Sequence, residues 1–346
     1  MAHVSKNPNI AMRDGVSPSC VALPRVRQSP WPLLIDHLAD RLPRIGRAEW
    51  LARMQAGSVL GEDGQPLASD APYVGGARVY YWRELPKEDP IPFEAAVLFE
   101  DEHLVVADKP HFLPVTPGGR YVRETLLVRL KAHLDCADQS PLHRIDRETA
   151  GLVLLSKRPQ DRDAYQSLFR TRQLDKVYEA VAPWRDGLGF PLTRQSHILE
   201  DEQAFYHMRE ARPDEGLPPN SETRIECVGQ QGARALYRLH PISGKRHQLR
   251  VHMHGLGLPI EGDQFYPEVR RGPDETEDFA QPLQLLARSI AFTDPVTGQS
   301  RHFESQRRLL WALGPFVGTC PASDASQTTS LPSPAGLAPT QPAINR

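Results

Sequence analysis

Apolar residues in the central and later parts of the chain recur at the spacing of short β-strands. Segments 97–99 and 104–107 flank a polar turn, which is the pattern of a β-hairpin. The uninterrupted apolar run 152–155 predicts a strand that is buried on both faces. Near the end, a turn rich in Pro and Gly separates 283–292 from 300–303, and this pattern predicts a second hairpin.

Helical periodicity is found between these strands. Four leucines fall on one face of 126–134, with basic residues on another face, which predicts an amphipathic helix. A second helix is predicted from 164 to about 172, with Leu168 and Phe169 on its apolar side. Alternation over 176–180 then predicts a strand.

The two ends of the chain have different patterns. Residues 1–30 are rich in Pro, Ser and Asn without apolar periodicity, which predicts a flexible tail. Residues 31–84 show two short helical patterns followed by two short strands, which predicts a small separate domain. The proline-rich segment 85–92 predicts a linker, and the Ser, Thr, Pro and Ala of 316–346 predict a disordered C-terminal tail. The main domain is then expected over 93–315.

Composition narrows the possible partners of this protein. The 346 residues carry a formal net charge of -2, so binding to a polyanion would need a local basic patch. Segment 227–260 provides one, because it contains no Asp or Glu. Its basic residues are Arg234, Arg238, Lys245, Arg246 and Arg250. We found no apolar run of membrane-spanning length and no signal-peptide core, so we expect no membrane and a cytoplasmic location.

Asp146 is the first candidate for chemistry. It lies between Arg144 and Arg147, shortly before the buried strand 152–155. An aspartate between two guanidinium groups stays ionised at neutral pH, which suits a nucleophile or an electrostatic partner better than a proton donor. Taken alone, this pattern is more typical of an aspartate that merely caps a turn.

Four motifs in order favour the catalytic interpretation. HRIDRETAGL at 143–152 resembles the HRLD-x-x-T-S-G-L motif of the RluA-type pseudouridine synthases. Segment 108–117 is similar to the family's D-K-P-x-G-x-x-V-x-P stretch, although it lacks the glycine, and 176–180 is similar to K-x-Y-x-A. Segment 244–263 resembles G-R-x-H-Q-I-R-x-H followed by G-x-P-I-x-G-D. Lys245 replaces the usual Arg there, which keeps the charge but loses the bidentate fork.

The resemblance implies the fold, the reaction and the substrate. It implies an α+β domain with the pseudouridine synthase fold, a mixed, largely antiparallel sheet and flanking helices. Residues 31–84 more weakly resemble the S4-like RNA-binding module that precedes many such domains. The implied reaction converts uridine in RNA to pseudouridine, which conserves atoms and oxidation level and requires no cofactor. Segment 111–117 is most similar to members that modify tRNA together with large-subunit rRNA, and a monomer is expected.

Roles for individual side chains follow from the same resemblance. It implies that Asp146 is the catalytic nucleophile, that Arg250 pairs with it, and that Tyr178 stacks on the uracil and shares in proton transfer. Leu249 is implied to be an apolar contact on the base. Cationic residues that could hold the flanking phosphates are Arg144, Arg147, Lys176, Lys245 and Arg246.

Two other functions remain open from the residues alone. The chain could be an RNA-binding module that has lost catalysis, or a hydrolase that uses Asp146 with His143 as a base. A metal site is not predicted, since the spacing of the later histidines does not reproduce H-E-x-x-H and no carboxylate or thiol completes a tetrahedral set. Those histidines are His240, His247, His252 and His254.

Overall fold

In a computed structural model the chain forms two compact units. Unit 1 comprises Met1–Pro92, Leu113–Pro141 and Lys157–Pro159, and unit 2 comprises Phe93–Phe112, Leu142–Ser156 and Gln160–Arg346. The predicted C-terminal tail and the part of the predicted linker at 85–87 lie outside the described residues. The structure describes residues 7, 10–43, 45–83, 88–202, 204, 207–270, 272 and 277–310.

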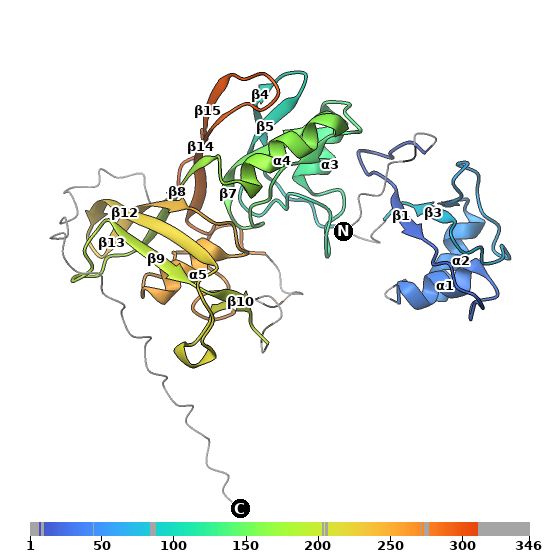
Figure 1. The fold of residues 1–346 in the computed structure, drawn as a ribbon, viewed down its shortest axis with the longest axis horizontal. Helices are drawn as coiled ribbons and strands as arrows, with labels where there is room; N and C mark the ends of the chain where they lie inside the picture. The colour runs from blue at the N-terminus through green and yellow to red at the C-terminus, as the bar shows by residue number, and fades with distance from the viewer. Residues whose placement is uncertain are drawn as a thin grey trace, which may run out of the picture. The chain divides into compact units, whose positions relative to one another are not determined.

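Unit 1 combines short helices with a small antiparallel sheet (Figure 1). The sheet has the order β1-β3-β2. Helices α1 and α2 bury Leu38 and Trp50 against Val79 of β3, as the helical spacing predicted. The elements are β1 (Ser19–Ala22), α1 (Leu34–Arg41), α2 (Arg47–Gln55), β2 (Val59–Leu60), β3 (Arg78–Tyr81), α3 (Leu126–His133) and β6 (Ser140–Pro141).

The prediction of a flexible tail over residues 1–30 is wrong for strand β1. This strand pairs with β3 in a register that runs from Ser19 opposite Tyr81 to Ala22 opposite Arg78. Four residues are too few to show strand alternation, and the partner strand lies far away in sequence. Ordering at β1 is therefore a consequence of tertiary pairing that local composition does not reveal.

Packing in unit 1 also includes a later part of the chain. Ile10 and Val16 are buried in one apolar cluster with Trp82 and with Val128 of α3. At the end of the predicted linker, the Glu88 carboxylate accepts hydrogen bonds from the backbone N–H groups of residues 122–124. Segment 113–141 therefore groups with the N-terminal residues, whereas we had expected it within a continuous domain 93–315.

Unit 2 contains one large mixed sheet. Along the order β4-β5-β7-β14-β8-β13-β12-β9, every pairing is antiparallel except that of β7 with β14, and β15 pairs with β14. The expected α+β fold with a mixed, largely antiparallel sheet is thus confirmed. The elements are β4 (Ala96–Glu100), β5 (Leu104–Lys109), β7 (Ala150–Ser156), α4 (Arg162–Arg170), β8 (Asp175–Pro183), β9 (Leu192–Ser196), β10 (Ile198–Glu200), β11 (Met208–Glu210), β12 (Ser221–Gln231), β13 (Arg234–Pro241), α5 (Gln248–Gly255), β14 (Leu285–Thr293) and β15 (Ser300–Glu304). Short 3-10 turns occur at Pro159–Asp161 and Pro213–Glu215.

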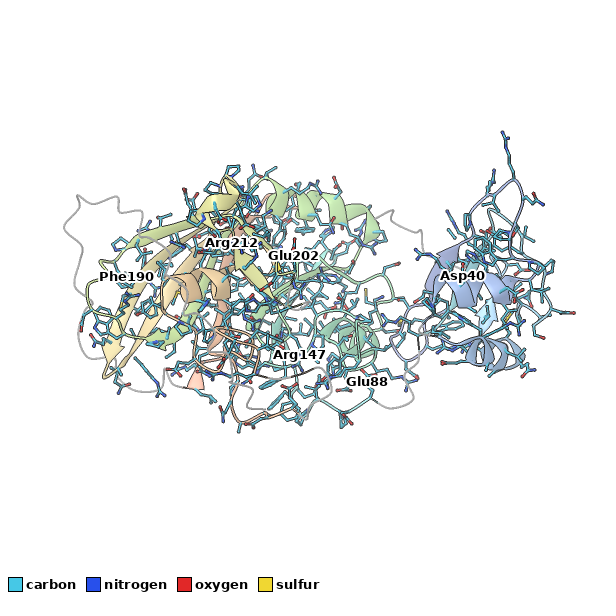
Figure 2. All side chains as sticks on the ribbon, turned by 90° about the horizontal axis from the view of Figure 1, so that it is seen from below. Asp40, Glu88, Arg147, Phe190, Glu202 and Arg212 are labelled. Atoms are coloured by element: carbon cyan, nitrogen blue, oxygen red, sulfur yellow. The ribbon has the colours of Figure 1, made fainter. Side chains whose placement is uncertain are left out.

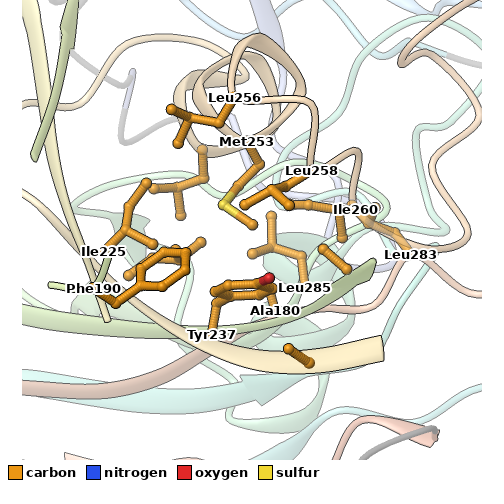
Figure 3. Close-up of a cluster of buried hydrophobic side chains, with 14 residues drawn as sticks. Ala180, Phe190, Ile225, Tyr237, Met253, Leu256, Leu258, Ile260, Leu283 and Leu285 are labelled. Carbon is orange, nitrogen blue, oxygen red and sulfur yellow. The ribbon is translucent and has the colours of Figure 1, made fainter. Parts of the chain in front are cut away.

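Helix α5 is held against the sheet by an apolar core. Figure 3 shows Met253 of this helix, and Leu256 immediately after it, above the rings of Phe190 and Tyr237. Both Met253 and Tyr237 are fully buried. Because α5 also carries Arg250, this packing sets the position of the guanidinium relative to the sheet.

The loop that carries Asp146 leads directly into β7 at its junction with β14. Gly151 lies opposite Ala287 in this parallel pair and has φ +109°. A Cβ atom at position 151 would lie 2.2 Å from the carbonyl oxygen of Ala287. Only glycine fits both this backbone conformation and this approach, so Gly151 determines how close the Asp146 loop lies to the centre of the sheet.

Candidate active site

Asp146 and Arg250 meet in unit 2 although 104 positions separate them in the sequence. Nη1 of Arg250 donates a hydrogen bond of 3.2 Å to Oδ2 of Asp146. The other side of the guanidinium makes a two-point contact with Asp263, with distances of 2.8 Å from Nε and 2.6 Å from Nη2. The Arg250 side chain is fully buried, whereas that of Asp146 is 25% exposed. The arrangement presents one carboxylate to a substrate and holds it from behind.

The environment keeps Asp146 ionised. Burial alone would raise the pKa of its carboxyl group, but the interactions with His247 and with the charges of Arg250 and Arg246 outweigh burial and lower the pKa below its usual value. The hydrogen bond from Arg250 acts in the same direction. A carboxylate in this state can act as a nucleophile or stabilise a cation, but it does not supply a proton at neutral pH.

Tyr178 lies on β8 and is electrostatically coupled to Asp146. The tyrosine is half-buried between β13 and β14, where it pairs with Leu239 and Ala287. Burial and then the negative charge of Asp146 raise the pKa of its phenol. The phenol therefore stays protonated at neutral pH and can donate a hydrogen bond. Leu249 packs in the same apolar cluster and is 7% exposed.

Two further residues, to which sequence reasoning gave no role, hold the loops of the site. Lys109 is fully buried and donates from Nζ to the carbonyl oxygens of Pro110 and Arg147, at 2.9 and 3.0 Å. Gln248 accepts a hydrogen bond from the backbone N–H of Lys245 and donates to Glu222 O and to the Thr223 hydroxyl. Lys109 and Gln248 both lie inside the family motifs at 108–117 and 244–263. Their place in these motifs was the one signal in the sequence that could have indicated their role.

Asp263 is the last residue of the segment 244–263, and the sequence alone assigned it no role. Its Oδ1 atom accepts from Arg250 and from the backbone N–H groups of Phe265 and Tyr266, at 2.9 and 3.2 Å for the latter two. The carboxylate is 3% exposed. A buried carboxylate that has both a guanidinium and two backbone donors is a firm anchor for Arg250.

The predicted phosphate-binding residues differ in their surroundings. Arg144 is exposed, and no ion pair joins it to another described residue. Arg147 (labelled in Figure 2) instead contacts Glu277 at 2.6 Å and Glu148 at 3.1 Å. Arg246 is 3.8 Å from Glu200 on the surface. For Lys176, burial lowers the pKa of the ammonium group.

The histidines have structural partners. Nε2 of His143 accepts a 3.1 Å hydrogen bond from the backbone N–H of Leu154, and its ring stacks on Phe169. Burial, together with Lys176, lowers the pKa of His143 to about 3. His252 is surrounded by the hydroxyl groups of Ser196, Ser221 and Thr223. Within the residues that the structure describes, His, Cys, Asp and Glu form no group suited to a metal ion.

The fold and the site together define an enzyme that acts through an ionised carboxylate. A buried arginine holds this aspartate at the sheet, near an aromatic side chain and surface cations. Over residues 103–255 the chain matches the profile of RNA pseudouridylate synthase. It is 33% identical over 205 residues to the dual-specificity RNA pseudouridine synthase RluA of Vibrio cholerae, covering 58% of this chain and 77% of that protein. This protein belongs to the RluA-type pseudouridine synthase family and is an RNA pseudouridine synthase, an isomerase.

Other relatives agree with this family. An RNA pseudouridine synthase of Synechocystis sp. is 29% identical over 235 residues, which cover 67% of this chain and 79% of that protein. Among solved structures, human RNA pseudouridylate synthase domain containing 1 is similar with a TM-score of 0.54 and 18% identity. That similarity covers 72% of this chain and all of the human chain, and it supports the fold. No helix among the described residues is long and apolar enough to cross a membrane.

Proposed function

We propose that this enzyme isomerises specific uridines in structured RNA, namely tRNA, large-subunit rRNA or both, with Asp146 as the nucleophile. The observation that carries the proposal is the hydrogen bond from the buried Arg250 to Asp146, whose side chain is 25% exposed. Relatives support the substrate class: RluA of Vibrio cholerae is named a dual-specificity enzyme, and a yeast relative at 32% identity is named a tRNA pseudouridine(32) synthase.

The reaction needs few chemical groups. The bond between ribose C1′ and uracil N1 breaks, a bond from C1′ to C5 forms, C5 loses its proton and N1 gains one. Asp146, held ionised by Arg250, supplies the carboxylate that starts this exchange. The C5 proton is released to water and N1 takes up a proton from water, so atoms and oxidation level are conserved and the reaction needs no redox partner.

Tyr178 and Leu249 would hold the uracil while it rotates. Tyr178 offers a flat ring and a protonated phenol beside Asp146, and Leu249 belongs to the same apolar cluster. We propose that the phenol donates a hydrogen bond to the base rather than removing the C5 proton as a phenolate, because burial and Asp146 both raise its pKa.

The uridine must leave its stack to reach Asp146, and surface cations would hold the flanking phosphates. We propose Arg144, Lys245 and Arg246 for this contact, since all three lie on the loops that precede β7 and α5. Arg147 and Lys176 would contribute mainly to the local positive potential. Arg147 already has carboxylate partners, and Lys176 is half-buried, with its ammonium pKa lowered by burial.

Residues 31–84 of unit 1 would act as an S4-like RNA-binding module. Helices α1 and α2 packed on a three-stranded sheet support this assignment, together with the basic residues Arg41, Arg47 and Arg53 on these helices. The monomeric state and the cytoplasmic location stay predictions.

Release of tritium tests the function. RNA labelled at uracil C5 loses tritium to water when pseudouridine forms, so bulk tRNA and rRNA would be incubated separately with the enzyme. We expect release by the wild type and none by Asp146→Ala or Asp146→Asn, with RNA affinity nearly unchanged. Asp214→Ala, at an exposed side chain in the 3-10 turn Pro213–Glu215, is the matched control. Turnover by either Asp146 variant would exclude the proposed nucleophile.

The hydrolase alternative depends on His143. Its Nε2 already accepts from Leu154 N–H within the fold, and its low pKa of about 3 opposes protonation during a reaction. His143→Gln keeps a possible acceptor for this N–H, so isomerase activity is expected to persist. Hydrolysis of RNA that disappears in this variant would support the alternative.

A further inference from the structure

His247 faces the one oxygen of Asp146 that Arg250 does not contact. Arg250 binds Oδ2, whereas Nε2 of His247 lies 4.0 Å from Oδ1. The imidazole is 8% exposed. This distance is too long for a direct hydrogen bond, but a small movement or one bridging polar group of the substrate would close it.

Tyr266 anchors the other ring nitrogen of His247. The Tyr266 hydroxyl lies 3.0 Å from Nδ1 of His247, and it contacts both the N–H and the carbonyl of Met208, at 2.9 and 3.1 Å. A lone pair on Nε2 would be repelled by the Asp146 carboxylate. The Tyr266 hydroxyl has a single proton, which it can donate either to Nδ1 of His247 or to the carbonyl oxygen of Met208. With a proton on Nε2 directed at Oδ1, the hydroxyl donates to Nδ1 instead of to Met208, and the repulsion at Asp146 favours this arrangement.

The backbone and the neighbouring rings hold His247 in this orientation. Its φ is +54°, a left-handed conformation immediately before the first residue of α5. The imidazole stacks on Phe265 with ring centres 6.0 Å apart and meets Tyr266 edge-on. Asp263, which binds Arg250, also accepts from the backbone N–H groups of Phe265 and Tyr266. One carboxylate thus anchors both sets of contacts to Asp146.

We propose that His247 is a positioning residue for the isomerisation: its Nε2–H orients the reactive oxygen Oδ1 of Asp146, and Tyr266 fixes the tautomer that makes this possible. The inference rests on the proposed role of Asp146. His247 is part of the motif at 244–263, but the sequence alone assigned it no role in the reaction.

Two substitutions at His247 separate this role from a purely structural one. The amide nitrogen of Gln can take the place of Nε2, whereas the amide of Asn takes the place of Nδ1. Asn tolerates the left-handed backbone better than Gln does. A structural role therefore predicts that His247→Asn retains more activity. We expect the opposite order, with kcat of His247→Gln within about tenfold of the wild type and His247→Asn and His247→Phe reduced by about 100-fold.

Binding and stability are measured in parallel. The KM for RNA is expected to stay within about threefold in all three variants, because the loss concerns a group that acts on Asp146. His302→Gln, at an exposed position on β15, is the control and should leave kcat unchanged. Equal kcat values for the Asn and Gln variants, or higher activity with Asn, would overturn the proposal.

The role of Tyr266 is tested by a double-mutant cycle. Tyr266→Phe removes the hydroxyl but keeps the ring against His247 and Arg250. We expect a smaller loss of kcat than with His247→Phe, and no additional loss when the two changes are combined. Additive losses would show that the Tyr266 hydroxyl acts only through Met208.

If the wild type itself released no tritium, the proposed function would fail first, so the two failures are distinguishable.

Discussion

Arg250 and Asp263 form a two-point ion pair in the interior of unit 2, where the two residues are 1% and 3% exposed. Because Asp263 binds Nε and Nη2 of Arg250, Nη1 is the group that contacts Asp146. Replacing a buried pair by apolar groups can be neutral, but removal of one partner leaves an uncompensated buried charge. Asp263 therefore supports both the fold and the catalytic carboxylate.

Substitution of Asp263 should affect stability and activity together. Asp263→Ala leaves the Arg250 charge with Asp146 and the more distant Glu148 only, and we expect the free energy of unfolding to fall by about 3 to 5 kcal/mol. Urea unfolding at pH 7 measures this loss. Asp214→Ala, whose carboxylate is exposed, should change the free energy by less than about 0.5 kcal/mol. A loss at Asp263 as small as that of the control would contradict the anchoring role.

Arg250→Lys should shift the pH dependence of the reaction. The ammonium group of lysine cannot contact Asp263 at two points and Asp146 as well. Asp146 therefore loses part of the positive potential that counteracts the effect of burial on its pKa. The pKa of Asp146 then rises, and the acid limb of the kcat/KM profile moves to higher pH. Arg224→Lys on β12 is the control. An unchanged acid limb in Arg250→Lys would show that Arg250 does not determine the ionisation of Asp146.

Acid should destabilise the fold through His143 and His252. Burial lowers the pKa of each to about 3, whereas both rings titrate near 6.5 when unfolded. Between these values the unfolded state binds more protons, so stability is full above pH 6.5 and falls as pH decreases. Each ring contributes a slope of about 1.4 kcal/mol per pH unit. Urea unfolding at pH 7, 6 and 5 measures the slope.

The matched variants for this titration are His252→Gln and His302→Gln. His252→Gln can keep part of the hydrogen bonding to Ser221 and Thr223 while removing one titrating group, so we expect a shallower slope. His302 is exposed, and its replacement should leave the slope unchanged. Equal slopes for the wild type and His252→Gln would mean that this ring is not buried in its neutral form.

Gly151→Ala should separate β7 from β14. The added Cβ atom would lie 2.2 Å from the Ala287 carbonyl oxygen, and φ of +109° is unfavourable for alanine. We expect a loss of about 3 kcal/mol in the free energy of unfolding and reduced activity, because the Asp146 loop continues into this strand. Gly244→Ala, where no atom lies within 4 Å of the added Cβ, is the stability control. Similar stability of the two variants would exclude the proposed steric role.

Local pattern predicted most of the elements around the site. The apolar run 152–155 corresponds to the fully buried strand β7, the alternation at 176–180 lies within β8, and the helical spacing of 164–172 corresponds to α4. Side-chain periodicity reports which face of an element is buried, and this information is local. Strand β1 was missed because its order depends on β3, far along the chain.

The sequence by itself determined which residue types are available for the chemistry: an aspartate between arginines, a tyrosine on a strand and a basic segment free of carboxylates. Only the tertiary structure decided that Arg250 contacts Asp146, that Asp263 anchors this arginine, and that His247 faces the remaining oxygen. These contacts are set by how α5 packs on the sheet and how closely β7 approaches β14. Distances between residues remote in sequence depend on that packing, which no local pattern contains.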